Sequence, residues 1–203
     1  MQDILPSDVA CIYIRQAEPL GLGHAVLCAQ PAVGREHFAV LLADDLIDGR
    51  AKGCLEQMVD VYSHFNCGVV AVEPVPHDET DRYGIVEVKP IDDGVGKIHS
   101  IVEKPQPDVA PSNLGVVGRY ILPGEIMEIL GRTRSGAGGE IQLTDAIATL
   151  LEKQQILAYE FSGTRYDCGS KLGYLEATID YALKHPELST EFSDYLRRRS
   201  ENL

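Results

Sequence analysis

The chain has 203 residues, of which 44% are hydrophobic and 24% are charged, a composition typical of a soluble globular protein. This length predicts one sizeable domain and leaves little room for two independent ones. The formal net charge of -13 argues against a nucleic-acid-binding surface, because such a surface needs clustered cations to neutralise phosphates. An acidic protein can still bind a nucleotide when a metal ion lies between its carboxylates and the phosphates.

Membrane attachment and disulfide bonding are not expected. No apolar stretch is long enough to cross a bilayer, and the first ten residues carry neither a basic start nor an apolar signal region. The five cysteines are scattered without a C-x-x-C pair, which indicates reduced thiols in a cytoplasmic protein. The histidines are equally dispersed, so the sequence predicts no zinc site.

Apolar patterns predict the elements in chain order. We expect strands at Val9–Ile14, Phe38–Ala43, Cys67–Val72, Tyr83–Val88, Ile98–Val102, Leu114–Leu122 and Ile156–Phe161. We expect helices at Gly23–Ala29, Leu55–Phe65, Glu125–Leu130, Gln142–Lys153, Leu172–Lys184 and Glu191–Arg199. Strands and helices alternate early, which is typical of an α/β domain with a largely parallel sheet. Strands follow one another between Val69 and Val102, so an antiparallel section is expected there.

An acidic strand end follows the apolar run Phe38–Leu42, where Ala43 leads directly into Asp44 and Asp45. In open α/β sheets, ligands bind beyond the carboxyl ends of the strands. One of these carboxylates could bind Mg²⁺, which prefers oxygen ligands and often keeps substrate phosphates in its shell. Aspartates also begin turns and cap helices, and on this stretch alone that interpretation is the stronger one.

Three other stretches carry polar groups at strand ends. Gln16 precedes a glycine-bearing loop, and its amide can both donate to and accept from a nucleobase edge. Glu103 and Lys104 suit sugar hydroxyls and a phosphate, although a surface ion pair is the alternative. Asp167 precedes Cys168 and Gly169, which favours turn chemistry, but opposite Asp44 it would complete a two-carboxylate metal site.

Several separated motifs occur together in one order. They are R-Q-x-x-x-L-G-L-G-H-A-V-L-C-A, L-A-D-D-L, Y-G-I-V, V-E-K-P, A-P-S-N-L-G-V-V-G-R-Y, G-A-G-G-E-I-Q-L-T-D-A-I and D-C-G-S-K-L-G-Y. From about Ile14 onward the chain thereby resembles the bacterial UTP–glucose-1-phosphate uridylyltransferases, or UDP-glucose pyrophosphorylases, of the sugar nucleotidyltransferase superfamily. The resemblance implies one Rossmann-like nucleotidyltransferase domain over residues 1–203, a mixed α/β sheet flanked by helices, with C-terminal helices over residues 170–203.

The resemblance also implies residue roles on the nucleotide side. Gln16 matches the glutamine that reads the uracil edge, and Gly21 matches the glycine whose backbone meets the same base. Asp44 and Asp167 match the aspartates that bind Mg²⁺, the implied cofactor, at the α-phosphate. For Asp45 a structural role is preferred, because the family does not require an acid there.

On the sugar side, the resemblance implies a backbone contact from Gly84 and hydroxyl contacts from Glu103. Lys104 matches the lysine that grips the sugar phosphate, and with Asp44 it would be catalytic. Asn113 and Val116 match positions that line the sugar pocket. Glu140 could equally be a sugar contact or a helix-start residue.

The implied reaction is nucleotidyl transfer. An oxygen of glucose-1-phosphate attacks the α-phosphorus of UTP, pyrophosphate leaves and UDP-glucose forms. The expected partners are therefore UTP, glucose-1-phosphate and UDP-glucose, with no nucleic acid and no membrane, and family members are commonly homo-oligomers. The run Arg197–Arg199 could be a subunit contact or a solvated face, of which the second is preferred.

The family's first strand, its G-x-G-T-R phosphate loop and its P-K-E motif have no counterpart in this sequence. We therefore expect an N-terminally incomplete domain that is inactive alone. The alternative is a non-catalytic UDP-sugar-binding protein or a regulatory partner of a full-length uridylyltransferase. A metal-dependent glycosyltransferase would use a D-x-D pattern, which Asp44 and Asp45 do not form.

Overall fold

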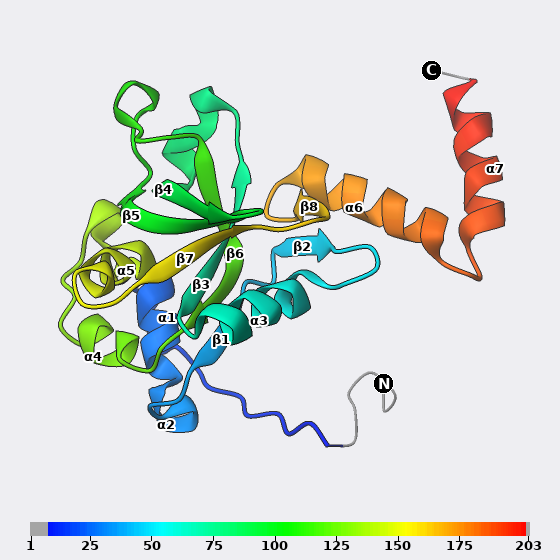
Figure 1. The fold of residues 1–203 in the computed structure, drawn as a ribbon. Coiled ribbons are helices and arrows are strands. Elements are labelled where there is room, and N and C mark those ends of the chain that lie inside the picture. Colours follow the sequence, from blue (N-terminus) through cyan, green and yellow to red (C-terminus); the bar gives the residue numbers. More distant parts are fainter. Residues whose placement is uncertain (1–7, 202–203) are drawn as a thin grey trace.

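The computed structural model describes residues 8–201 and consists of a central sheet with helices on both faces (Figure 1). The helices are α1 (Leu22–Cys28), α2 (Gln30–Val33), α3 (Cys54–Phe65), α4 (Ile126–Leu130), α5 (Leu143–Leu151), α6 (Lys171–Lys184) and α7 (Ser189–Ser200). The strands are β1 (Phe38–Leu41), β2 (Asp45–Asp48), β3 (Gly68–Pro74), β4 (Gly84–Asp92), β5 (Val95–Glu103), β6 (Leu114–Leu122), β7 (Ile156–Glu160) and β8 (Thr164–Asp167). Short 3-10 turns lie at His77–Arg82 (η1), Pro107–Val109 (η2) and Ala137–Gly139 (η3).

The main sheet has six strands in the order β1-β6-β3-β7-β5-β4, and the start of β6 pairs with β4 as well. Among the described strands of this sheet, only β3 and β7 run parallel to each other; the other pairs, including the β4–β5 hairpin, are antiparallel. The expectation of a largely parallel sheet is therefore wrong, while the expected mixed sheet flanked by helices is confirmed. Alternating strand and helix patterns do not by themselves distinguish a parallel neighbour from an antiparallel one.

Two apolar cores lie on opposite faces of the sheet. On β3, Val70 and Val72 face the core formed with α1, α4 and α5, whereas Val69 and Ala71 face the core formed with α3. Both sets of side chains are almost fully buried, as expected of a central strand covered on both faces. Side-chain alternation along one strand therefore fixes the three-layer arrangement of helix, sheet and helix.

Most predicted elements are confirmed to within a few residues. The strand predicted at Leu114–Leu122 has the observed bounds of β6, and the helices predicted from residues 55, 125, 142, 172 and 191 correspond to α3, α4, α5, α6 and α7. β4 and β5 are longer than predicted because their pairing continues into an exposed hairpin. The prediction missed β2 and the short α2.

The strand predicted at Val9–Ile14 is wrong. This segment belongs to neither sheet of the described residues, and Ile12 and Tyr13 are 72% and 93% exposed. A β-rich run becomes a strand only where a neighbouring edge satisfies its backbone hydrogen bonds. The apolar pattern carried no information about that neighbour.

A small second sheet joins β2 to β8, with Asp45 opposite Asp167. This ribbon lies between the main sheet and α6, and α7 follows at the far end of α6 (Figure 1). No helix within residues 8–201 is long and apolar enough to cross a membrane. The cysteine side chains are free thiols, and burial raises the pKa of the Cys54 thiol to about 11.

Met58→Ala and Val59→Ala test the core at neighbouring positions of α3. Met58 is fully buried, and we expect its truncation to lower the free energy of unfolding by about 2–5 kcal/mol through lost contacts and a residual cavity. Val59 is 44% exposed, so its truncation should change the same quantity by less than about 0.5 kcal/mol. Urea unfolding monitored by circular dichroism measures both; equal losses would contradict the placement of α3.

Candidate functional site

A cavity of about 240 Å³ lies next to the turn that follows β1. It brings together the predicted site residues Asp44, Gly84, Glu103, Val116 and Asp167. The remaining lining residues, which sequence reasoning did not assign to a binding or catalytic role, are Leu22, Leu42, Asp45, Arg82, Tyr83, Gly118, Tyr120, Gln142, Leu143, Thr144 and Arg165. Residues from distant parts of the chain thus converge at one edge of the main sheet.

The turn that carries Asp44 is held by Arg119 of β6. The Arg119 guanidinium donates to the carbonyl oxygen of Leu42, at 3.0 Å, and to the carbonyl oxygen of Asp45. It therefore grips the backbone on both sides of Ala43 and Asp44. The Cys168 N–H donates to the Asp44 carbonyl oxygen at 2.7 Å, which ties the same turn to the loop after β8. Asp44 itself remains exposed.

Asp45 has a structural role, as predicted. Its side chain is only 10% exposed; Oδ2 accepts from the Gly118 N–H at 2.9 Å, and Oδ1 pairs with the Arg165 guanidinium. A Cβ on Gly118 would lie 2.5 Å from Asp45 Oδ2, so only glycine allows this contact. Asp45 lines the cavity, but both its oxygens are already bonded.

Arg165 connects three parts of the site. Besides Asp45, its guanidinium donates to Glu73 Oε1 at 2.8 Å and lies 5.4 Å from the centre of the Tyr83 ring. Burial alone would lower the pKa of this guanidinium, but hydrogen bonding to Tyr83 and the charge of Asp45 raise it above its ordinary value. Arg165 thus stays charged. The signal that could have revealed it is its position two residues before Asp167, on the same face of the strand.

Asp167 lies across the loop from Asp44. A Cβ on Gly169 would be 3.1 Å from Asp167 Oδ1 and 3.5 Å from Asp44 Oδ2, so both carboxylates border the same small space. Arg82 of η1 approaches Asp167 Oδ2 at 3.3 Å and supplies a cation there.

The donor set fits Mg²⁺. Within residues 8–201, no group of three or more His, Cys, Asp or Glu side chains is arranged to hold a metal ion. Mg²⁺, however, is commonly bound by one or two carboxylates together with substrate phosphates. Asp44 and Asp167 provide two carboxylates, which leaves the remaining ligands to water and a phosphorylated substrate.

The backbone of Asp167 is fixed by the first turn of α6. Ser170 caps that helix by accepting from the Gly173 N–H at 3.0 Å, and its hydroxyl donates to the Asp167 carbonyl oxygen at 3.0 Å. A Cβ on Gly173 would lie 2.2 Å from that same carbonyl oxygen. Glycine at this position lets the helix approach the strand end closely.

Glu103 and Gly84 form the opposite wall. The Thr144 hydroxyl donates to Glu103 Oε2 at 2.6 Å, and a Cβ on Gly84 would lie 3.3 Å from the same oxygen. The absence of a side chain at Gly84 therefore leaves room beside the carboxylate. Burial raises the pKa of the Tyr120 phenol above its ordinary value, and the charge of Glu103 adds to the rise.

Lys104 lies at the rim rather than in the lining of the cavity. Its ammonium is 3.7 Å from Glu103 Oε1, and its side chain is 49% exposed. Its backbone φ of 48° lies in the left-handed region, which is uncommon for lysine and typical of residues held by their surroundings. The Lys104 N–H donates to the Tyr83 carbonyl oxygen at 2.9 Å, which stabilises this conformation.

Gln16 and Gly21 lie together beside the cavity. Neither lines it, but Leu22, the residue after Gly21, does. The Gln16 amide nitrogen donates to the Gly21 carbonyl oxygen at 3.1 Å and lies 2.9 Å from His24 Nδ1. Gly21 has a φ of 99°, and a Cβ there would be 2.7 Å from Glu140 Cβ. The loop is therefore closed on itself and packed against the segment before α5.

Asn113 and Glu140 do not line the cavity. The Asn113 amide donates to the Val75 carbonyl oxygen at 3.4 Å, which indicates a structural contact between β3 and the start of β6. Glu140 accepts from the Gln142 amide at 3.2 Å, and α5 begins only at Leu143. The interpretation of Glu140 as a helix-start residue is wrong, because the chain is still extended at the N-cap, Gln142.

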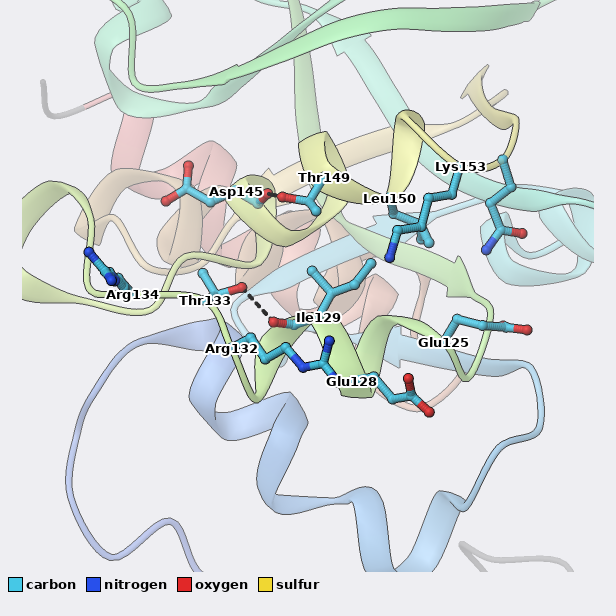
Figure 2. Close-up of a pocket in the computed structure, with 11 residues that line it drawn as sticks. Glu125, Glu128, Ile129, Arg132, Thr133, Arg134, Asp145, Thr149, Leu150 and Lys153 are labelled. Atoms are coloured by element: carbon cyan, nitrogen blue, oxygen red, sulfur yellow. Dashed lines mark hydrogen bonds between the residues drawn. The ribbon is translucent and has the colours of Figure 1, made fainter.

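A larger cavity, of about 760 Å³, lies elsewhere, between α4 and α5 (Figure 2). Its floor is apolar, at Ile129 and Leu150, and its rim carries both cations and anions, such as Lys153 and Asp145. None of the predicted site residues lines it. Because charges of both signs face the opening, no single ligand chemistry is favoured there.

The sequence matches the nucleotidyl transferase family over residues 2–184. The UTP–glucose-1-phosphate uridylyltransferase of Streptococcus pneumoniae is 46% identical over 204 residues, which cover 97% of this chain and 67% of that protein. The chain belongs to this family, among the UTP–glucose-1-phosphate uridylyltransferases. The predicted nucleotidyltransferase resemblance is thereby confirmed.

Solved structures of the family have the same fold. A UTP-bound UGPase from Acinetobacter baumannii has a TM-score of 0.86 at 46% identity, over 96% of this chain and 68% of that one. A UDP-glucose pyrophosphorylase complexed with UDP-glucose has a TM-score of 0.83 at 45% identity, over 86% of this chain and 66% of that one. This uridylyltransferase-family chain thus spans about two thirds of the length of these relatives.

Removing the Arg165 charge should destabilise the fold. We expect Arg165→Met to lower the free energy of unfolding by about 3–5 kcal/mol, because Asp45 would become a buried charge without a partner. Asp45→Asn in the same chain should recover much of this loss, since the buried carboxylate would no longer be charged. Lys52→Met removes an exposed ion pair with Asp60 and should cause no measurable change. Urea unfolding of the parent, Arg165→Met, Asp45→Asn and the double variant measures the coupling, with Lys52→Met as the control; simple additivity would contradict the coupling.

Proposed function

We propose that this chain belongs to an enzyme that transfers UMP from UTP to glucose-1-phosphate, with Mg²⁺ held between Asp44 and Asp167. The observation that carries the proposal is the convergence of both aspartates with Gly84 and Glu103 around one cavity, in a chain 46% identical to a uridylyltransferase. The proposed compartment is the cytoplasm, in keeping with the unpaired cysteines.

The proposed reaction is an in-line displacement at phosphorus. A phosphate oxygen of glucose-1-phosphate forms a bond to the α-phosphorus of UTP, while the bond from that phosphorus to the oxygen bridging to the β-phosphate breaks. Pyrophosphate leaves with the electron pair, and no proton transfer is needed. A bound Mg²⁺ would neutralise the charge that develops on the phosphate oxygens.

The protein side of this reaction is positioning. Arg119 holds the Asp44 turn, and the first turn of α6 holds Asp167, so the two carboxylates keep their separation when a polyanion enters. Preorganised groups of this kind lower the barrier because they need not reorganise during the reaction. Arg165 is already paired with Asp45 and Glu73, whereas Arg82 in the lining and Lys104 at the rim can both pair with phosphate oxygens.

The sugar would lie against Glu103 and Gly84. The Thr144 hydroxyl already occupies one oxygen of Glu103 and thereby orients the carboxylate toward the cavity, where it can accept from sugar hydroxyls. Gly84 leaves space for a ring beside it. On the other side, the closed loop of Gln16 and Gly21 would meet the flat edge of uracil.

A second candidate is a non-catalytic UDP-sugar-binding protein or a regulatory partner of a full-length uridylyltransferase. Binding of a UDP-sugar would need only the cavity that Asp44, Gly84, Glu103 and Asp167 line. The two candidates differ in turnover. Incubation with UTP, glucose-1-phosphate and Mg²⁺ should give UDP-glucose and pyrophosphate if the chain is an enzyme, whereas binding of UDP-glucose without turnover supports the second candidate.

Titration of UDP-glucose into the purified chain by calorimetry tests the metal site. We expect binding that requires Mg²⁺ and that Asp44→Asn weakens at least tenfold, because the neutral amide is a poor ligand for the metal. Asp48→Asn, a change of the same kind outside the cavity, should leave the affinity unchanged. Binding that is indifferent to Mg²⁺, or equally weakened by both substitutions, would refute the proposed role of Asp44.

Gly84→Ala tests the sugar wall. The added methyl group would lie 3.3 Å from Glu103 Oε2, so we expect a tenfold or greater loss of UDP-glucose affinity with little change in the affinity for UTP. Gly53→Ala is the matched control, because a Cβ there meets nothing within 4 Å. Calorimetry with each nucleotide measures both variants; an equal loss for UTP and UDP-glucose would place the sugar elsewhere.

A further inference from the structure

The side chain of Gln16 is fixed by the first turn of α1. Its amide nitrogen, Nε2, donates to the Gly21 carbonyl oxygen at 3.1 Å and lies 2.9 Å from His24 Nδ1. Gly21 is the N-cap of α1, and its carbonyl oxygen also accepts from the Ala25 N–H at 3.1 Å. The helix therefore sets the position of both groups that Gln16 Nε2 contacts.

The Gly21 carbonyl oxygen determines which end of the Gln16 amide faces the helix. The two ends of an amide have nearly the same shape, but only the NH₂ end can donate a hydrogen bond. A carbonyl oxygen can only accept, so the opposite orientation would place Gln16 Oε1 against the Gly21 oxygen with no hydrogen between them. The NH₂ end therefore faces Gly21 and His24.

His24 must then present a lone pair at Nδ1. The Gln16 NH₂ group only donates, so a hydrogen on Nδ1 would meet a second hydrogen, although the two nitrogens are 2.9 Å apart. A neutral imidazole carries one ring N–H, which is consequently at Nε2. Nε2 lies 3.8 Å from Cys28 Sγ, one helical turn further along, where the sulfur can accept weakly. The contacts of the ring thus agree on a single tautomer.

Gln16 is left with one free polar atom. Its two amide hydrogens are used by Gly21 and His24, whereas Oε1 accepts no hydrogen bond from any residue within 8–201. The residue is half-buried, which leaves part of its side chain accessible. A nucleobase that meets Gln16 therefore faces an acceptor without a donor beside it.

We propose that His24 is a positioning residue that makes Gln16 select a base with a hydrogen on its ring nitrogen N3, such as uracil, over a base with a lone pair there, such as cytosine. The inference rests on the proposed function, which places the uracil edge against this loop. Uracil N3 carries a hydrogen that Oε1 can accept, whereas the lone pair of cytosine N3 would face the lone pairs of Oε1. Polar groups left unpaired in this way lower the affinity for the wrong ligand.

Loss of the acceptor at His24 would weaken this selectivity. One Gln16 N–H would then lose its partner and could donate to the lone pair of cytosine N3. His24→Asn would keep an acceptor, because the asparagine side-chain oxygen is bonded to Cγ, as Nδ1 is in histidine. The ratio of the two affinities, rather than either affinity alone, is therefore the quantity that depends on His24.

Calorimetric titration of UDP and CDP into the full chain, each with Mg²⁺, tests the selectivity. We expect the parent chain to bind UDP at least tenfold more tightly than CDP, and His24→Leu to reduce this ratio at least fivefold. His24→Asn should preserve the ratio. Cys28→Ala is the control, because it removes the sulfur contact at Nε2 and leaves the contact at Nδ1 in place.

The outcomes separate the role of His24 from the proposed function. If neither UDP nor CDP binds to the parent chain, the proposed function is wrong and the selectivity is wrong with it. If UDP binds but His24→Leu leaves the ratio unchanged, or His24→Asn lowers the ratio as much as His24→Leu does, only the role of His24 is overturned.

Nitrogen-15 NMR of the imidazole reports the tautomer without any nucleotide. At mildly alkaline pH we expect His24 Nδ1 to show the chemical shift of a nitrogen without hydrogen, and Nε2 that of a nitrogen with hydrogen. A hydrogen on Nδ1 would overturn the positioning role, whether or not the chain binds nucleotides.

Discussion

The Asp45 carboxylate links the two sheets of the molecule. It belongs to β2, accepts a hydrogen bond from the β6 backbone at Gly118, and pairs with Arg165 of β8. Arg165 in turn reaches Glu73 at the end of β3. Because a buried charge is costly without a partner, this contact fixes the small ribbon against the main sheet. The cavity exists only where these two sheets meet, so its shape depends on this ion pair.

The adjacent residues Asp44 and Asp45 therefore have different roles. Asp45 is turned inward and fully bonded, while Asp44 is turned outward on a turn gripped by Arg119. Asp44 lies in the turn after β1 and Asp45 is the first residue of β2, and this difference in position separates an exposed carboxylate from a structural one. Arg165 offsets the charge of the Asp45 carboxylate, which lowers its repulsion of the neighbouring Asp44 carboxylate. This arrangement leaves the Asp44 carboxylate available to a ligand.

Sequence reasoning succeeded where the signal was local. Apolar periodicity located β6 and the helices α3 to α7, and family motifs placed Asp44, Gly84, Glu103, Val116 and Asp167 at what proves to be one cavity. It failed where the outcome depended on distant partners. The run at Val9–Ile14 has strand composition but no neighbouring edge, and the antiparallel neighbours of β6 cannot be read from its own residues. Thr144 and Arg165 were missed for the same reason, since their importance comes from contacts with Glu103 and Asp45.

The junction at Gly173 has a mechanical meaning. With only 2.2 Å between its missing Cβ position and the Asp167 carbonyl oxygen, the helix axis and the strand end meet without an intervening side chain. The Ser170 hydroxyl bonds to the same carbonyl oxygen. No side chain therefore separates the start of α6 from the end of β8, and a tilt of this helix would shift the backbone of Asp167 directly. The orientation of α6 and the position of the Asp167 carboxylate are therefore coupled, so that one cannot change without the other.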